Sequence, residues 1–127
     1  MADVLFVEND ALFGEMYVRS LERAGHSVRL VPNSLAALEA LEHQLPDVML
    51  FDILLPGPNG LWLLKELRRR KSWRSLPVMI ITNLAEAELA MPSKLRDKLG
   101  IVRYLLKTKT TPQEVTAAVG ETLDYAA

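Results

Sequence analysis

The chain has 127 residues, half of them apolar, and a formal net charge of −1. This length predicts one domain with one sizeable core, and the balanced charge argues against binding to nucleic acid or to an anionic membrane surface. The absence of cysteine excludes disulfides, thiolate metal sites and thiol nucleophiles, and it favours a reducing compartment such as the cytoplasm.

Five short apolar runs alternate along the chain with segments of helical periodicity, which predicts alternating strands and helices. The predicted strands, in chain order, are 2–7, 27–31, 48–53, 77–82 and 102–106. The predicted helices that alternate with them are 10–24, 34–45, 60–71, 85–99 and a last helix that begins at 112. No apolar run approaches the roughly 20 residues of a membrane span.

Local signals mark several of these helix ends. Asp10 precedes the first helix, where a carboxylate suits capping and the helix dipole. Ser34 is expected to cap the second helix, and Pro92 interrupts the fourth. Thr111-Pro112-Gln113-Glu114 is a capping box with proline at the first helical position, so it predicts the start of the last helix.

Continuous apolar strands that alternate with helices are typical of a parallel sheet covered on both faces. We therefore predict an α/β fold with a doubly wound, five-stranded parallel sheet, flavodoxin-like, in the strand order 2-1-3-4-5 with five helices. Residues 1–127 are expected to form a single domain.

Polar residues stand where the predicted strands end. Glu8 and Asn9 follow the first strand, and Asp52 lies at the end of the third. Thr82 ends the fourth strand and Lys107 follows the fifth. In an open parallel sheet these ends meet at one edge, which is where such folds place their ligands.

This set of side chains indicates phosphoryl chemistry. Oxygen ligands close together suit Mg²⁺, which also accepts phosphate oxygens as ligands. A carboxylate such as Asp52 can attack a phosphoryl group and form an acyl phosphate. A metal ion, a lysine and a hydroxyl would stabilise the transferring oxygens.

The chain resembles the receiver domain of two-component response regulators over essentially its whole length. The resemblance rests on the acidic cluster after the first strand and on Asp-x-x-x-Pro-Gly-x-x-Gly after the third. It also rests on the hydroxyl residue that ends the fourth strand and on Tyr-x-x-Lys at the fifth. Each motif alone is weak, but all four in order are specific.

The resemblance implies a role for each of these residues. Asp52 would be the phosphoacceptor, Glu8 and Asn9 would hold the metal-site positions with Asp52, and Lys107 would bind the phosphate. Thr82 and Tyr104 would be the switch pair, although Tyr104 is equally well read as a half-buried strand aromatic. These roles imply a histidine kinase or phosphotransfer protein as donor, and a downstream protein partner or a homodimer as output, through the fourth helix, fifth strand and last helix. No output domain is expected within these residues.

The chain departs from the family at several positions. Asn9 stands where an aspartate usually ligates the metal, so that position brings no charge. Thr108 replaces the usual proline after the lysine, where the family keeps a cis peptide. Leu54 and Leu84 follow Asp52 and Thr82 by two residues and cannot orient an attacking water, which predicts slow hydrolysis of an acyl phosphate.

Two further features have open interpretations. The basic run Arg68-Arg69-Arg70-Lys71 is expected to be a solvated helix end, where cations suit the dipole. Trp62 shares a polar helix face with Lys65, Glu66 and Arg69, so we expect it to be largely exposed and a candidate interface residue.

Two other functions compete with the phosphorylation switch. A receiver-like interaction module that is not phosphorylated is suggested by Asn9. An aspartyl phosphatase would need a second carboxylate two residues after Asp52, and Leu54 at that position argues against an enzyme.

Overall fold

The computed structural model describes residues 2–83 and 97–126, and the side chains within that part except those of residues 125 and 126. Its strands are β1 (Asp3–Val7), β2 (Ser27–Val31), β3 (Val48–Phe51), β4 (Val78–Thr82) and β5 (Ile101–Leu106). Its described α-helices are α1 (Ala11–Arg23), α2 (Ser34–His43), α3 (Gly60–Arg69) and α6 (Pro112–Ala126). Two 3-10 turns, η1 (Lys71–Trp73) and η2 (Lys107–Lys109), complete the elements described.

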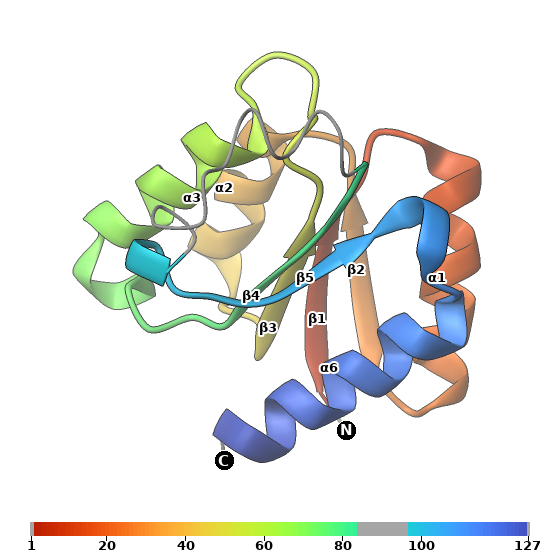
Figure 1. The fold of residues 1–127 in the computed structure, drawn as a ribbon. Coiled ribbons are helices and arrows are strands. Elements are labelled where there is room, and N and C mark those ends of the chain that lie inside the picture. Colours follow the sequence, from red (N-terminus) through yellow and green to blue (C-terminus); the bar gives the residue numbers. More distant parts are fainter. Residues whose placement is uncertain (1, 84–96, 127) are drawn as a thin grey trace.

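The five strands form one parallel sheet in the order β2-β1-β3-β4-β5, which confirms the predicted topology. Figure 1 shows the strands side by side, with β5 at one edge of the sheet. β1 is paired with both β2 and β3, so the ends of β1 and β3 are adjacent. This adjacency brings the residues that follow β1 and β3 to one place at the edge of the sheet.

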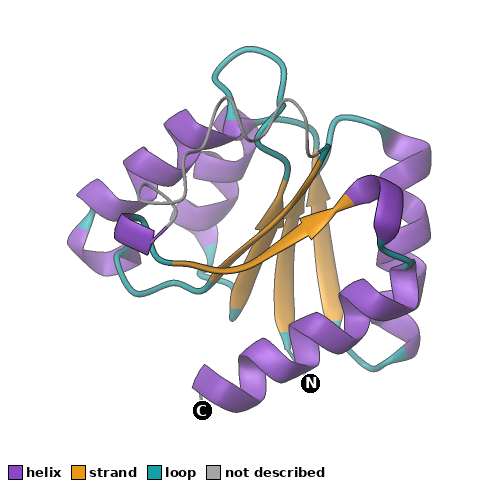
Figure 2. Ribbon diagram, viewed as in Figure 1, coloured by secondary structure: helices purple, strands orange, loops and turns teal. Residues whose placement is uncertain are grey.

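Helices cover both faces of the sheet, as Figure 2 shows. One buried core lies between the sheet and helices α2 and α3, and it includes Phe51, Leu64 and Trp73. The other lies between the sheet and helices α1 and α6, and it includes Phe6 and Tyr17. Strands with apolar side chains on both faces can be buried only in this three-layer arrangement.

Most predicted elements match the observed ones within one or two residues, but the capping of α2 was predicted wrongly. Asn33 is the capping residue of α2, because its side chain accepts a hydrogen bond from the N–H of Ala36 at 2.8 Å. Ser34 is buried instead, and its hydroxyl donates to the carbonyl of Pro58 at 2.7 Å. The predicted fourth helix, with Pro92, falls mainly on residues 84–96, outside the described part of the chain.

The last helix begins as its sequence predicts. The N–H of Glu114 donates to the Thr111 hydroxyl at 3.1 Å, and the N–H of Thr111 donates to the Glu114 carboxylate at 3.2 Å. This reciprocal capping satisfies two backbone donors at the start of α6. It also fixes where the segment between β5 and α6 ends.

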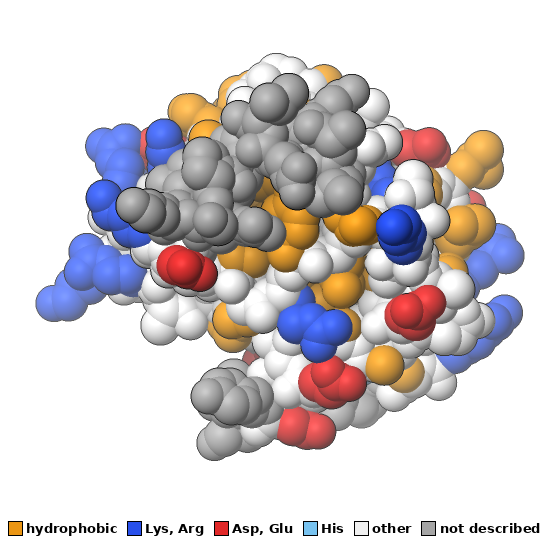
Figure 3. Space-filling model, viewed as in Figure 1, with side chains coloured by type: hydrophobic (Ala, Val, Ile, Leu, Met, Phe, Trp, Pro, Cys, Tyr) orange, Lys and Arg blue, Asp and Glu red, His pale blue; other side chains and the backbone are white. Residues whose placement is uncertain are grey.

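The basic run at the end of α3 is only partly solvated. Lys and Arg side chains gather over α3 and η1, at the left of Figure 3. Arg68, however, is half-buried, and its guanidinium donates to the carbonyls of Leu99, Leu76 and Trp73 at 2.8, 2.9 and 3.2 Å. The expectation of a fully solvated helix end is therefore wrong for Arg68, which ties α3 to the starts of β4 and β5.

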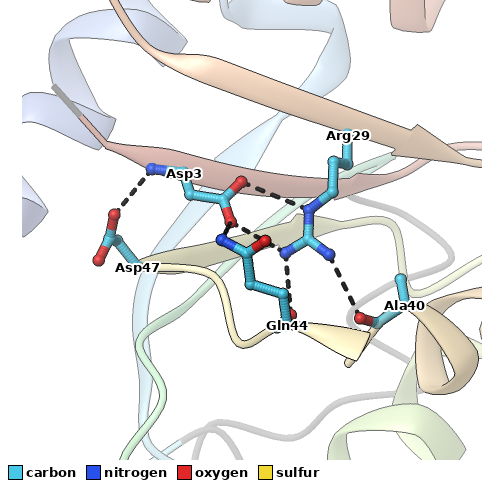
Figure 4. A network of polar contacts seen from close by, with 5 residues as sticks. All are labelled: Asp3, Arg29, Ala40, Gln44 and Asp47. Atoms are coloured by element: carbon cyan, nitrogen blue, oxygen red, sulfur yellow. Dashed lines mark hydrogen bonds and ion pairs between the residues drawn. The ribbon is translucent and has the colours of Figure 1, made fainter. Parts of the chain in front are cut away.

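A second polar network, drawn in Figure 4, joins the start of β1 to β2 and to the end of α2. The guanidinium of Arg29 on β2 pairs with the Asp3 carboxylate at 3.1 Å and donates to the carbonyls of Ala40 and Gln44. The N–H of Asp3 donates to the Asp47 carboxylate at 2.7 Å. This network holds the end of α2 against β1 and β2.

No helix in the described part of the chain is both long and apolar enough to cross a bilayer.

Candidate functional site

Asp52 follows β3 directly and is 4% exposed, so its carboxylate is buried at the edge of the sheet. Its Oδ1 accepts hydrogen bonds from the N–H of Leu54 at 2.9 Å and from the hydroxyl of Thr82 at 2.5 Å. Thr82 is the last residue of β4, which pairs with β3. The pairing of β4 with β3 therefore places the Thr82 hydroxyl next to the Asp52 carboxylate.

The loop after Asp52 must return closely to the end of β3. A Cβ atom at Gly60 would collide with the carbonyl oxygen of Asp52 and with Cα of Ile53, so only glycine fits there. The N–H of Gly60 donates to the carbonyl of Ile53 at 2.8 Å. Glycine at the first position of α3 thus lets the helix start against the strand end that carries Asp52.

Glu8 follows β1 and is also 4% exposed. Its Oε2 accepts a hydrogen bond from the N–H of Asp10 at 2.9 Å. Asp10 in turn caps α1, because its side chain accepts from the N–H of Phe13 at 3.1 Å. The expectation that Asp10 caps the helix is confirmed, and Glu8 is fixed by the start of that helix.

Lys107 joins the two carboxylates. Its Nζ lies 2.6 Å from Oδ2 of Asp52 and 2.9 Å from Oε1 of Glu8. Burial lowers the pKa of Lys107, but its contacts with Asp52 and Glu8 outweigh burial, and the pKa is raised above its usual value. Lys107 is therefore an ammonium ion at neutral pH, and one positive charge faces two buried negative charges.

Four of the predicted site residues thus meet at one point: Glu8, Asp52, Thr82 and Lys107. Asn9 does not join them. It is exposed, and its side chain makes no hydrogen bond or ion pair with any residue in the described part of the chain.

The other candidates on β5, α3 and η2 have different surroundings. Tyr104 is half-buried on β5 and packs against the core beneath α2 and α3. Trp62 is 36% exposed, so its predicted exposure is met only in part. Thr108 lies in η2, and no peptide bond among the described residues is cis. Leu84 lies outside the described residues.

Sequence reasoning missed two aromatic residues beside Lys107. The Phe13 ring lies 4.5 Å from the ammonium of Lys107. Tyr17, one turn further along α1, is buried, and its hydroxyl donates to the carbonyl of Thr110 at 3.1 Å. Their spacing on α1 reads only as a core-facing stripe, so the sequence carries no signal for the contact with Lys107.

The donor set suits a hard cation. The buried carboxylates of Glu8 and Asp52 converge on a positive group, the ammonium of Lys107, and the amide of Asn9 follows Glu8 in the chain. No group of three or more histidine, aspartate or glutamate side chains in the described residues could hold a metal ion. The two carboxylates of Glu8 and Asp52 are hard oxygen donors, so they fit Mg²⁺ as part of a ligand set that water and phosphoryl oxygens would complete.

Comparison with known proteins shows which family this chain belongs to. A family model described as the response regulator receiver domain matches residues 4–120. The transcriptional regulatory protein RstA of Escherichia coli (strain K12) is 33% identical over 118 residues, which cover 93% of this chain and 46% of RstA. The transcriptional regulatory protein CseB of Streptomyces coelicolor is 36% identical over 90 residues, 68% of this chain and 37% of CseB. The chain spans less than half the length of these two relatives.

Solved structures extend the similarity to the whole fold. A putative response regulator from Chloroflexus aurantiacus J-10-fl has a TM-score of 0.84 at 30% identity, over 97% of this chain and 98% of that one. The chemotaxis response regulator CheY4 of Vibrio cholerae has a TM-score of 0.83 at 21% identity, over 96% of this chain and 98% of that one. At that identity the second likeness supports the fold alone.

Proposed function

The chain belongs to the family of response regulator receiver domains, and we propose that it is a single receiver domain that accepts a phosphoryl group on Asp52. The observation that carries this proposal is the environment of Asp52. One of its carboxylate oxygens accepts from the Thr82 hydroxyl, and the other faces the Lys107 ammonium at 2.6 Å. Receiver domains are signalling modules rather than conventional enzymes.

The proposed transfer breaks the bond between phosphorus and a donor histidine nitrogen and forms a bond between phosphorus and an oxygen of Asp52. Asp52 is the nucleophile, and it is held in place by the N–H of Leu54 and the hydroxyl of Thr82. The Lys107 ammonium lies 2.6 Å from Oδ2 of Asp52, where it would stabilise the negative charge of a phosphoryl group added to this carboxylate. Positioning and charge compensation are the main contributions that a protein makes to phosphoryl transfer.

Mg²⁺ is the cofactor that the receiver family binds at its phosphorylation site. Here Glu8, Asn9 and Asp52 would hold it, with only two of the three carrying charge. When bound, the ion would neutralise charge on the phosphoryl oxygens. The N–H of Asp10 keeps the buried carboxylate of Glu8 oriented for this role.

A histidine kinase or a phosphotransfer protein is the proposed donor. α1 starts beside Glu8, because the N–H of Asp10 binds that carboxylate. The first two turns of α1 expose Leu12 and Met16, at 79% and 52% of their surface. Two exposed apolar side chains one turn apart, on the helix that starts beside Glu8, suit docking of a donor protein.

The proposed output runs from Thr82 to Tyr104 and then to a surface that includes β5 and α6; the predicted fourth helix, expected to share this surface, lies outside the described residues. On this surface β5 exposes Val102 and Arg103, and Arg103 pairs with Glu121 of α6 at 2.9 Å. The partner would be a downstream protein or a second copy of this chain. Because RstA and CseB are named as transcriptional regulatory proteins, control of transcription is the proposed output class.

We assign no nucleic acid or membrane binding to this domain, and we place it in the cytoplasm. Hydrolysis of the acyl phosphate is expected to be slow, because Leu54 beside Asp52 is apolar and 38% exposed.

Treatment with acetyl phosphate and Mg²⁺ followed by hydroxylamine tests whether the phosphoryl group is bound to Asp52 as an acyl phosphate. An acyl phosphate on Asp52 is released by hydroxylamine, whereas phosphate found on a serine or threonine hydroxyl would contradict the proposal.

A phosphorylation-independent interaction module is the second candidate, and one observation favours it. Asn9 is exposed and brings no charge, while Lys107 already compensates both buried carboxylates. Such a site could persist without metal or phosphate. The variant Asn9→Asp, described below, separates the two candidates.

A further inference from the structure

Lys107 stands at the start of a short connection between β5 and α6. The connection runs from Lys107 to Thr111 as Lys-Thr-Lys-Thr-Thr, and its first three residues form η2. It contains no proline that would fix a backbone angle. A rigid position for the Lys107 ammonium must therefore come from contacts with other elements.

Besides the ion pairs of Lys107 with Asp52 and Glu8, two contacts with this connection come from one face of α1. The hydroxyl of Tyr17 donates to the carbonyl of Thr110 at 3.1 Å, at the far end of this connection. The ring of Phe13 lies 4.5 Å from the Lys107 ammonium, at the near end. The two rings also contact each other, with centroids 4.6 Å apart, so they act as one unit.

The unit is anchored in the core. Tyr17 is 2% exposed, and its ring meets the edge of Phe6 on β1 with centroids 6.2 Å apart. Burial raises the pKa of Tyr17, so its hydroxyl stays protonated and can donate. Phe6 lies on the strand that leads to Glu8, so the same strand supports both the aromatic unit and one of the carboxylates.

We propose that Tyr17 and Phe13 are positioning residues for Lys107, and this proposal builds on the function proposed for Asp52. Tyr17 fixes the end of the connection through its hydrogen bond to Thr110, and Phe13 holds the ammonium through the face of its ring. Together they direct the ammonium to Asp52 and Glu8 at once. Neither residue touches the reacting atoms.

The variant Tyr17→Phe tests the proposal, because it removes the hydroxyl and keeps the ring. Ser20→Ala is the matched control. Ser20 lies on the same helix, and its hydroxyl bonds that of Thr116 on α6 at 2.7 Å, away from Lys107. Both variants lose one hydroxyl contact between α1 and the C-terminal part of the chain, so their losses of stability should be similar. Phe13→Leu is a further variant that keeps an apolar side chain and removes the aromatic face.

The first readout is the NMR signal of the Lys107 ammonium in protein with isotope-labelled lysine, assigned with Lys107→Arg. We expect Tyr17→Phe and Phe13→Leu to shift or broaden this signal, and Ser20→Ala to leave it unchanged. The second readout is the rate of phosphorylation by acetyl phosphate, which should fall roughly tenfold in Tyr17→Phe, because misplaced groups lose rate steeply.

The NMR readout decides the positioning role without any phosphorylation. An unchanged Lys107 signal in Tyr17→Phe, or an equal change in Ser20→Ala, would overturn it. If the parent takes no phosphoryl group while the signal still depends on Tyr17, the positioning stands and the function proposed for Asp52 fails.

Discussion

Lys107 and Asp52 form an ion pair of 2.6 Å between the ends of β5 and β3, across the end of β4 that lies between them in the sheet. The same ammonium contacts Glu8 at 2.9 Å, and the side chains of both carboxylates are almost fully buried. A single cation thus compensates two anions that are largely shielded from water. This arrangement determines how the site should respond to added metal, added charge and loss of its polar contacts.

Asn9→Asp should tighten Mg²⁺ binding and speed phosphorylation, because it restores a carboxylate next to Glu8. An ion held mainly by Coulomb attraction gains affinity from an added anion, and about 1.4 kcal/mol corresponds to tenfold in binding. Calorimetric titration of the parent and the variant measures the change. If neither affinity nor rate changes, residue 9 does not belong to the metal site. If only the variant is phosphorylated, the interaction module is the correct function.

Thr82→Ala should leave Asp52 able to accept a phosphoryl group but blunt the response of the output surface. The Thr82 hydroxyl is the contact that links Asp52 to the end of β4, and alanine removes it. The measurement is partner binding or self-association before and after phosphorylation. A variant that responds to phosphorylation as the parent does would show that output does not run through Thr82 and Tyr104.

Arg68→Met should lower the free energy of unfolding by about 3 kcal/mol or more, because the buried carbonyls that Arg68 serves lose their donor. Those at Leu99 and Leu76 accept at 2.8 and 2.9 Å. Urea denaturation measures the effect. Arg69→Met is the matched control, since the Arg69 side chain is 75% exposed and, among the described residues, pairs with Glu66 three residues away, a contact worth about 0–1 kcal/mol. Equal losses in the two variants would show that the Arg68 contacts do not stabilise the fold.

Trp62→Ala should weaken self-association or partner binding if Trp62 is an interface residue. Because the residue is only 36% exposed, a moderate loss of stability, on the order of 1–2 kcal/mol, should accompany the change. Analytical ultracentrifugation and thermal unfolding measure the two effects separately. Leu35→Ala, at a residue of α2 that is 60% exposed, controls for loss of surface apolar area in general. A large loss of stability with unchanged association would assign Trp62 to the core.

The sheet order and the meeting of Glu8, Asp52, Thr82 and Lys107 were predictable, because strand periodicity and parallel topology place strand ends at one edge. The capping box at Thr111 was predictable because it is local. By contrast, contacts that depend on which side of a helix meets a distant loop were not predictable from the sequence. The guanidinium of Arg68 and the hydroxyl of Tyr17 donate to backbone carbonyls. Because every residue has a backbone carbonyl, the sequence does not indicate which one will accept such a hydrogen bond.

Asn33 and Asn9 show that residue types alone also fail to predict which of two adjacent residues makes a local contact or is buried. Asn33 and Ser34 are adjacent and both are good capping residues, so only the backbone decides which one caps α2. Asn9 occupies a position expected to face the metal, yet it is exposed while its neighbour Glu8 is buried. Burial of one of two adjacent polar residues depends on the turn between β1 and α1, which the residue types alone do not determine.

The most direct test of the central claim is the intact mass of the protein after incubation with acetyl phosphate and Mg²⁺, with Asp52→Asn as control. The parent should gain the mass of one phosphoryl group, and Asp52→Asn should gain none, because the nucleophilic carboxylate is absent. A parent that gains no mass with Mg²⁺ present, or an Asp52→Asn variant that gains as much as the parent, would contradict phosphoryl acceptance on Asp52.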